Sequence, residues 1–312
     1  MAEGGARVRA LVRPGGSTSS LTDLHVEIVE ADVRDSDSLL TAFADADVVF
    51  HVAGTVSIAG RGLKPLRETN VLGTRNVLEA CGRTGVRRLV YTSSVHAFVE
   101  APSGTCLTET EIIDPSQTRG PYARSKAEAT LLVREAAERG LDIVTVFPSA
   151  IVGPYDFRPS HTGELILACC QGRLKAYVHG AYNFVDVRDV AQGLVTAATE
   201  GRAGEGYILA GHETTVEGLL LTVEQVAGTP APQVRLPLGL ARAASGLAPA
   251  YYWATRQQAL FTSYSLHVIT SNCSMSTEKA QRELGYTPRP FATTVEDTIA
   301  WFRQQGMLAG PS

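Results

Sequence analysis

Two residues that could move a proton together, Tyr122 and Lys126, lie four positions apart in the segment RGPYARSKAEA. Residues at this spacing share one face of an α-helix, so the ammonium group can lie beside the phenol. A free phenol has a pKa near ~10, and a neighbouring cation stabilises the phenolate and lowers that pKa. The pair therefore predicts a tyrosine that acts as a general acid or base. The alternative is a solvated helix face, and the surrounding sequence has to decide between the two.

The segments that would position this pair alternate between two patterns. Short apolar runs predict strands, and the stretches between them have the amphipathic period of helices. The expected strands cover residues 7–13, 26–33, 47–54, 87–94 and 141–147, and the expected helices cover residues 36–43, 66–85 and 121–140. This alternation is typical of a parallel sheet covered by helices on both faces, so the predicted fold is an α/β, Rossmann-type doubly wound sheet.

The regular alternation loosens after Pro148. We therefore expect one domain over residues 1–150 and a smaller, mainly helical part over residues 151–312, with some later segments returning to the sheet. The segments 154–182 and 236–264 are apolar and aromatic and are expected to line or cover a substrate pocket.

The composition narrows the class of protein. With 312 residues, 44% of them apolar and 19% charged, the chain can bury full cores and is not of a disordered type. A formal net charge of −4 does not predict a surface for nucleic acid or for an anionic membrane. No apolar run reaches the roughly 18 residues needed to span a bilayer. The sequence has no signal-peptide pattern, and its five cysteines do not have metal-ligand spacing. Both observations favour a cytoplasmic protein with reduced thiols and no metal.

Seven ordered motifs resemble the extended short-chain dehydrogenase/reductase family, of the NAD-dependent epimerase/dehydratase type. They are VEADVRD (29–35), VVFHVAG (48–54), NVLGTRNVLEA (70–80), RRLVYTSSV (87–95), YARSK (122–126), VFPSAIVGP (146–154) and NFVDVRDVA (183–191). Within that family, the stretch over residues 161–191 resembles the dihydroflavonol-reductase-like and hopanoid-associated sugar-epimerase-like branch. The resemblance covers nearly the whole chain and implies that residues 1–150 form an NAD(P)-binding domain.

The resemblance also implies a role for each matching residue. Tyr122 would be the general acid or base, Lys126 would lower its pKa and bind the nicotinamide ribose, and Ser94 would hold the substrate oxygen. Asn70 would open the motif helix near the nicotinamide, although a helix cap is the alternative for this residue and for Asp32. The implied cofactor-binding residues are Arg13, Asp32, Val33, Val52, Ala53, Gly54, Asn70, Thr92, Tyr122, Lys126 and Pro148.

The residue at the end of the strand expected over residues 7–13 bears on the choice between NAD and NADP. Relatives that select NAD usually place an acidic residue there, which accepts a hydrogen bond from the ribose 2′-hydroxyl. This chain has Arg13 in ALVRPGG. A guanidinium favours a 2′-phosphate, so NADP is the preferred prediction and NAD the alternative. A solvent-facing arginine without a ligand is the competing interpretation.

The chain departs from the family at its start. Family members open with a strand, a T-G-x-x-G-x-x-G turn and a helix whose N-terminus holds the pyrophosphate. This sequence opens with MAEGGARVRALVR, so we expect the first strand and the glycine-rich turn to be missing. Because that strand lies in the middle of the sheet, we expect the natural protein to be longer. A chain that truly starts at Met1 is expected to bind dinucleotides weakly or not at all.

Two further departures concern the substrate. Nucleotide-sugar relatives often carry an Arg-Asp pair where this chain has Tyr182 and Asn183, and the arginine grips the diphosphate. Dehydratases place an acidic pair after their threonine, where this chain has Val95 and His96. These differences argue against a nucleotide sugar and against elimination chemistry. His96 either reaches the substrate or is a packed or solvated histidine.

The sequence therefore predicts an NAD(P)-dependent oxidoreductase that acts on a carbonyl or secondary alcohol of a small molecule. An epimerase with tightly held NAD is the first alternative, because it would use the same three residues. A non-catalytic binding protein on the same fold is the second alternative. Relatives pair through helices that match residues 66–85 and 121–140, so a homodimer is expected, and neither a nucleic-acid nor a membrane partner is.

Overall fold

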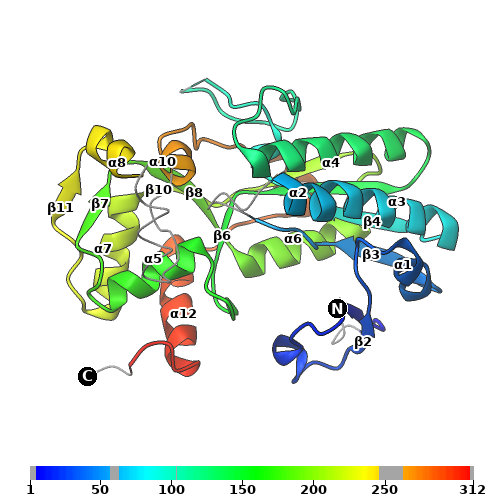
Figure 1. Cartoon of the computed structure of the whole chain (residues 1–312), viewed down its shortest axis with the longest axis horizontal. Helices are drawn as coiled ribbons and strands as arrows, with labels where there is room; N and C mark the ends of the chain where they lie inside the picture. Colours follow the sequence, from blue (N-terminus) through cyan, green and yellow to red (C-terminus); the bar gives the residue numbers. More distant parts are fainter. Residues whose placement is uncertain (1–4, 57–62, 103, 246–262, 310–312) are drawn as a thin grey trace.

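The computed structural model describes residues 5–56, 63–102, 104–245 and 263–309. Its central feature is a four-stranded parallel sheet with the order β3-β4-β5-β9 (Figure 1). The strands are β3 (Val48–His51), β4 (Arg88–Thr92), β5 (Ile143–Pro148) and β9 (Gly206–Leu209). The middle strands β4 and β5 are almost wholly buried, as continuous apolar runs in a parallel sheet should be.

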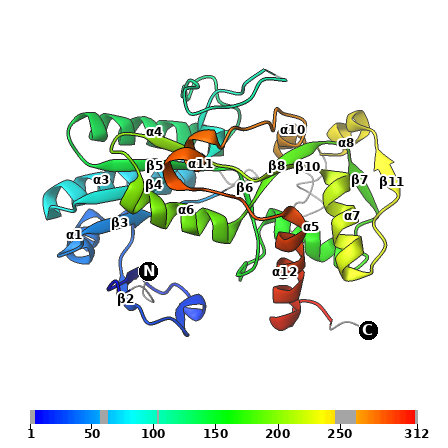
Figure 2. The ribbon, with the colours of Figure 1, turned by 180° about the vertical axis from the view of Figure 1, so that it is seen from behind.

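Helices cover both faces of this sheet. Figures 1 and 2 show α3 (Gly73–Thr84) and α4 (Pro121–Glu138) on one face and α6 (Val187–Glu200) on the other. Local sequence sets their ends, because Pro121 occupies the first turn of α4 and Gly85 ends α3 in the left-handed conformation at φ 71°. The predicted α/β class with a Rossmann-type parallel sheet is confirmed.

A second parallel pair, β1 (Arg9–Val12) and β2 (Glu27–Glu30), stands apart from the four-stranded sheet. Figure 1 shows this pair beyond β3 and α1 (Ser36–Phe43). Within the described ranges no strand joins β1 to β3, and no glycine-rich turn leads into a helix. This gap between β1 and β3 is the position at which the sequence predicts that the first strand of the family is missing.

The remaining strands form two small sheets. One has the order β10-β8-β6, and the other pairs β11 with β7. Their bounds are β6 (Ala150–Val152), β7 (Ala176–Val178), β8 (Ala181–Asp186), β10 (His212–Thr215) and β11 (Val234–Leu236). A separate apolar core joins them to α5 (His161–Cys170), α7 (Val216–Ala227) and α12 (Phe291–Gln304). The boundary at residue 150 stays a prediction, although β9 does return to the large sheet.

The other described elements are short. They are η2 (Ser19–Leu21), α2 (Leu63–Leu66), the π-helical η3 (Arg67–Leu72), η4 (Val95–Ala97), α8 (Leu238–Ser245), α10 (Ser263–Val268) and α11 (Glu278–Leu284). Residues 246–262, the middle of one predicted pocket segment, lie outside the described residues. A search of the described helices finds none that is both long and apolar enough to cross a bilayer.

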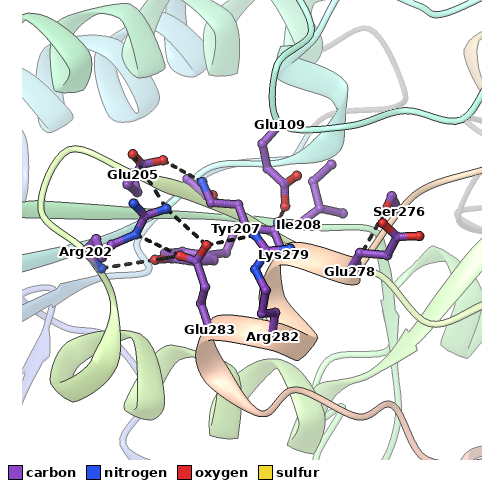
Figure 3. Close-up of polar contacts among 11 residues, drawn as sticks. Glu109, Arg202, Glu205, Tyr207, Ile208, Ser276, Glu278, Lys279, Arg282 and Glu283 are labelled. Carbon is purple, nitrogen blue, oxygen red and sulfur yellow. Dashed lines mark hydrogen bonds and ion pairs between the residues drawn. The ribbon is translucent and has the colours of Figure 1, made fainter.

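Side chains cover the outer edge of β9. Glu109 accepts a hydrogen bond from the Ile208 amide at 2.9 Å, and Lys279 of α11 donates to the Gly206 carbonyl at 2.8 Å (Figure 3). Arg202 and Glu283 form a two-bond ion pair beside them. An edge strand with occupied backbone groups is a poor template for a further strand. These contacts also fix α11 and the segment before it against the sheet.

A buried charge network joins the large sheet to the second core. The Asp186 carboxylate is completely buried, caps α6, and accepts hydrogen bonds from Arg188 at 2.9 and 2.8 Å. Arg188 also reaches the partly exposed Asp297 on α12 at 2.7 Å. The same arginine therefore has one buried and one exposed acidic partner.

These two partners should differ in their effect on stability. Asp186→Ala removes a helix cap and the completely buried anion that pairs with the partly exposed Arg188, so the free energy of unfolding should fall by about 2–3 kcal/mol. Asp297→Ala removes an exposed partner and should cost less than about 1 kcal/mol. Urea unfolding measures both values, and equal losses would contradict a leading role for the buried pair.

Candidate active site

Helix α4 places Lys126 at the carboxyl end of the large sheet. The side chain is 6% exposed, and Nζ donates to the Thr92 carbonyl at 2.8 Å. Nζ also lies 5.4 Å from the centre of the Tyr91 ring, within range of a cation–π interaction. Burial disfavours the ammonium form and lowers the pKa of Lys126 to about 8.

Tyr122 lies one turn earlier on the same helix, as the spacing predicts. Burial raises the pKa of Tyr122, while a hydrogen bond with the Ser94 side chain opposes that rise. Ser94 follows β4, and its hydroxyl also accepts a hydrogen bond from the His96 amide at 3.2 Å. The expected net lowering of the Tyr122 pKa is not found, because burial is the largest effect and Lys126 is not among the causes of the shift.

Asn70 connects the loop after β3 to the catalytic helix. Its Oδ1 accepts from the Thr55 amide at 2.7 Å, and its Nδ2 donates to the Thr55 carbonyl at 2.9 Å and to Ser125 Oγ at 3.0 Å. Ser125 in turn donates to the Tyr122 carbonyl. The expectation that Asn70 opens or caps a helix is wrong, because it lies inside the π-helical segment η3.

The hydrogen-bond chain continues from Asn70 to β3. Thr74 donates its hydroxyl hydrogen to the Asn70 carbonyl, so it must accept from His51 Nε2, 2.9 Å away. His51 is buried, and both burial and the nearby charge of Lys126 lower its pKa to about 3. A neutral imidazole with its proton on Nε2 therefore lies beneath the site.

Several predicted cofactor residues surround these groups. Val52, Ala53 and Gly54 form an exposed loop after β3, and a Cβ on Gly54 would lie 3.6 Å from both Asn70 Oδ1 and Lys126 Nζ. Pro148 is buried at the end of β5. The Thr92 hydroxyl is buried and has no hydrogen-bond partner among the described residues. All of them lie at the carboxyl ends of neighbouring parallel strands, where ligands of open α/β sheets bind.

The predicted adenine-end residues lie together on the β1–β2 pair. Asp32 accepts hydrogen bonds from Arg34 at 3.0 and 2.6 Å, which lowers the pKa of Asp32, and the charge of Arg13 adds to that effect. The Val33 carbonyl accepts a hydrogen bond from Asn76 on α3 at 2.9 Å, which links this end to the rest of the molecule. Asp35, rather than Asp32, caps α1.

A pocket adjoins the catalytic helix on the substrate side. Its lining is Val95, His96, Phe98, Val99, Glu100, Ala101, Leu107, Arg119, Ala123, Tyr182, Tyr264, His267, Val268, Ser271, Asn272 and Met275. His96 Nε2 shares a hydrogen bond with the Tyr182 hydroxyl, and burial lowers the pKa of His96 to about 4. Tyr264 is the last residue of the pocket segment predicted over residues 236–264, although no local pattern marks it individually. Within the described ranges, no group of acidic, histidine or cysteine side chains has the arrangement of a metal site.

This fold, with Ser94, Tyr122 and Lys126 at the carboxyl end of its parallel sheet, is that of an extended short-chain dehydrogenase/reductase. More specifically, the chain belongs to the NAD dependent epimerase/dehydratase family, whose model matches residues 1–210.

Similar proteins cover almost the whole chain. The chain is 35% identical to "Sterol demethylase protein B" of Methylococcus capsulatus, over 97% of this chain and 93% of that protein. It is 32% identical to "Putative dihydroflavonol 4-reductase" of Synechocystis, over 98% of this chain and 90% of that protein. The crystal structure of gox2253 superposes with a TM-score of 0.86 at 35% identity, over 98% of this chain and 93% of that one.

The buried histidine makes stability depend on pH. The folded pKa of His51 lies below its unfolded value near ~6.5, so the unfolded chain takes up a proton first as the pH falls. Stability is therefore complete above that value and is lost as the pH falls toward 3. At a pH near ~4.5 the loss from this group should be about 2–3 kcal/mol.

The variant His51→Gln should remove this part of the pH dependence, while the exposed His25→Gln variant keeps the wild-type slope. His96, with its lowered pKa, leaves a residual slope in both variants. Urea unfolding across this pH range provides the measurement. Parallel curves for wild type and His51→Gln would show that His51 is not held neutral.

Proposed function

We propose that this protein is an NAD(P)-dependent oxidoreductase that interconverts a carbonyl group and a secondary alcohol of a small molecule. The observation that carries the proposal is the interaction between the Ser94 and Tyr122 side chains, which opposes the rise of the Tyr122 pKa, with Lys126 one turn away on α4. The three groups meet where β4 and α4 face the carboxyl end of the sheet, and a fourth residue, Asn70, fixes that helix from the other side.

The residues divide the chemistry among them. Ser94 would hold the substrate oxygen and stabilise its developing negative charge, and Tyr122 would donate a proton to it. A raised Tyr122 pKa keeps the phenol protonated near neutral pH, which suits the reductive direction. When bound, the nicotinamide supplies or accepts the hydride. Lys126 would orient the ribose.

The nicotinamide end of the site fits such a cofactor. The unpartnered Thr92 hydroxyl, the exposed loop 52–54 and the Lys126 amine lie together at the carboxyl ends of β3 and β4. Asn70 holds that loop beside Lys126 through both of its hydrogen bonds to Thr55. The described residues contain no glycine-rich turn at a helix N-terminus, so no residue is assigned to the pyrophosphate.

The proposal extends to NADP as the preferred cofactor. Arg34 neutralises Asp32, the acidic group that would repel a 2′-phosphate. Arg13 is exposed, and its side chain makes no hydrogen bond or ion pair within the described ranges, so its guanidinium is available to an anion.

Replacing Arg13 should change cofactor choice. Arg13→Ser should raise the Kd for NADP about 10-fold and leave the Kd for NAD unchanged, because only the 2′-phosphate would contact this side chain. Arg87→Ser, which removes an exposed arginine near α3, is the matched control and should change neither value. Calorimetric titration provides the measurement, and equal changes for both cofactors would contradict the assignment.

Removing the phenol hydroxyl should separate an enzyme from a binding protein. Tyr122→Phe should lower kcat/KM for carbonyl reduction by about 10²- to 10⁴-fold, followed through the absorbance of the reduced nicotinamide. Tyr286→Phe is the control, because that hydroxyl bonds the Ala210 carbonyl outside the pocket. Unchanged turnover in Tyr122→Phe would overturn the role of Tyr122 and favour the non-catalytic alternative.

An epimerase remains the second candidate, because the family description includes epimerases and the same three residues would serve it. Such an enzyme would copurify with its dinucleotide and show no net change in nicotinamide absorbance. Tyr182 argues against a nucleotide-sugar substrate, because Tyr182 and Asn183 stand where such relatives often carry an Arg-Asp pair, and the Tyr182 hydroxyl is bonded to His96.

We also propose a homodimer that pairs through α3 and α4. Leu131 on α4 is an apolar side chain that is 40% exposed in the single chain. Burial of such side chains in an interface is favourable.

A further inference from the structure

His96 is the centre of an aromatic cluster in the substrate pocket. Its ring centre lies 6.3 Å from that of Tyr122, 6.1 Å from that of Tyr182 and 6.4 Å from that of Tyr264. The three tyrosines come from α4, β8 and α10, so the fold brings together segments that are far apart in the sequence. We refer to these four residues as the tyrosine cluster.

The three tyrosine hydroxyls differ in their hydrogen bonds. The Tyr182 hydroxyl bonds His96 Nε2, and the Tyr122 hydroxyl interacts with the Ser94 side chain, which affects its pKa. The Tyr264 hydroxyl is buried and has no partner within the described part of the chain. A buried hydroxyl without a partner is destabilising, so its presence beside the catalytic tyrosine requires an explanation.

Tyr264 is held firmly against the catalytic helix. Gly120 immediately precedes α4 at φ 90°, and a Cβ there would lie 2.5 Å from Cε2 of Tyr264. The ring therefore packs directly on the backbone that leads into Pro121 and Tyr122. Hydrogen bonds from Asn272 to the carbonyls of Pro102 and Thr105, at 3.3 and 2.6 Å, fix the segment that follows α10.

We propose that Tyr264 is a specificity-determining residue whose hydroxyl bonds a second oxygen of the substrate, close to the reacting carbon. This inference rests on the proposed function. The ring centres of Tyr122 and Tyr264 both lie within 6.4 Å of that of His96, so we expect the two substrate oxygens to be near neighbours, as in an α-hydroxy ketone.

The pocket chemistry favours an uncharged second oxygen. The pocket acid Glu100 is already paired with His267, and Arg119 is exposed, so no charged side chain within the described ranges is buried beside the Tyr264 hydroxyl. The pocket wall mixes polar residues with apolar ones, and Val95, Phe98 and Met275 are among the apolar residues. A hydroxyl or carbonyl oxygen can satisfy Tyr264 without the cost of burying a charge.

The variant Tyr264→Phe tests this assignment with two ketones. The probes are a dihydroflavonol and the matching flavanone, which lacks only the hydroxyl beside the ketone. The variant should raise KM for the dihydroflavonol about 10-fold and leave kcat within about 3-fold, because one hydrogen bond to the bound substrate is lost. KM for the flavanone should not change. Equal changes for the two ketones would overturn the proposal.

Thermal unfolding of the free protein supplies a second readout. Because the variant removes an unpaired buried hydroxyl, its Tm should equal or exceed that of the wild type. Tyr286→Phe, which loses a hydrogen bond to Ala210, should lower Tm and leave both KM values unchanged. A clear fall in the Tm of Tyr264→Phe would show that the hydroxyl has a structural partner and would overturn the proposal.

Binding measurements test this inference independently of the proposed catalytic function. If the wild-type protein turns over neither ketone, calorimetry of the same two probes still tests Tyr264. Tighter binding of the dihydroflavonol than of the flavanone, lost in Tyr264→Phe, would support the assignment even without catalysis. A wild-type protein that binds the two ketones equally, or binds neither, would overturn it.

Discussion

The burial of one cation, the Lys126 ammonium, constrains the rest of the site. A buried charge is costly unless hydrogen bonds compensate it, and here the Thr92 carbonyl and the Tyr91 ring lie next to it. The same charge helps to hold His51 in its neutral form. That neutral imidazole begins the chain of hydrogen bonds through Thr74, Asn70 and Ser125 to the backbone of Tyr122. The position of the catalytic tyrosine is therefore coupled to β3 through groups that all remain uncharged.

The proposed substrate side contains neutral groups, in contrast to the charged Lys126 on the proposed cofactor side. Burial raises the pKa values of Tyr122, Tyr182 and Tyr264 and lowers that of His96, so each of these groups is neutral near pH 7. Neutral donors and acceptors in the pocket wall select ligands by the position of their oxygens rather than by charge. A nucleotide diphosphate would find no buried cation among the described residues that line this pocket. The contrast between the charged cofactor side and the neutral substrate side supports a lipophilic, oxygen-bearing substrate.

Local patterns in the sequence predicted much of this arrangement. The helix expected over residues 36–43 has those bounds, and the pair Tyr122 and Lys126 lies on one helix, because periodicity and capping are local properties. The resemblance to the family supplied Ser94, which lies shortly after β4. The π-helical turn at Asn70, the Asp32–Arg34 pair and the contact of Tyr264 with Gly120 were not predicted. Each depends on tertiary contacts or on backbone geometry that the residue types do not encode locally, and the approach of Tyr264 to Gly120 joins two distant segments.

The two ends of the proposed dinucleotide site are held by different kinds of interaction. Buried hydrogen bonds fix the nicotinamide end, whereas the adenine end rests on the β1–β2 pair, whose charged groups Arg13 and Arg34 are exposed. Exposed ion pairs contribute little and are screened by salt, while buried bonds are not. The adenine end joins the core through a few contacts, such as Asn76 with Val33 and Arg9 with the Ala42 carbonyl. The proposed determinants of cofactor choice and of catalysis thus lie in separate parts of the molecule, so a change at one end should leave the other intact.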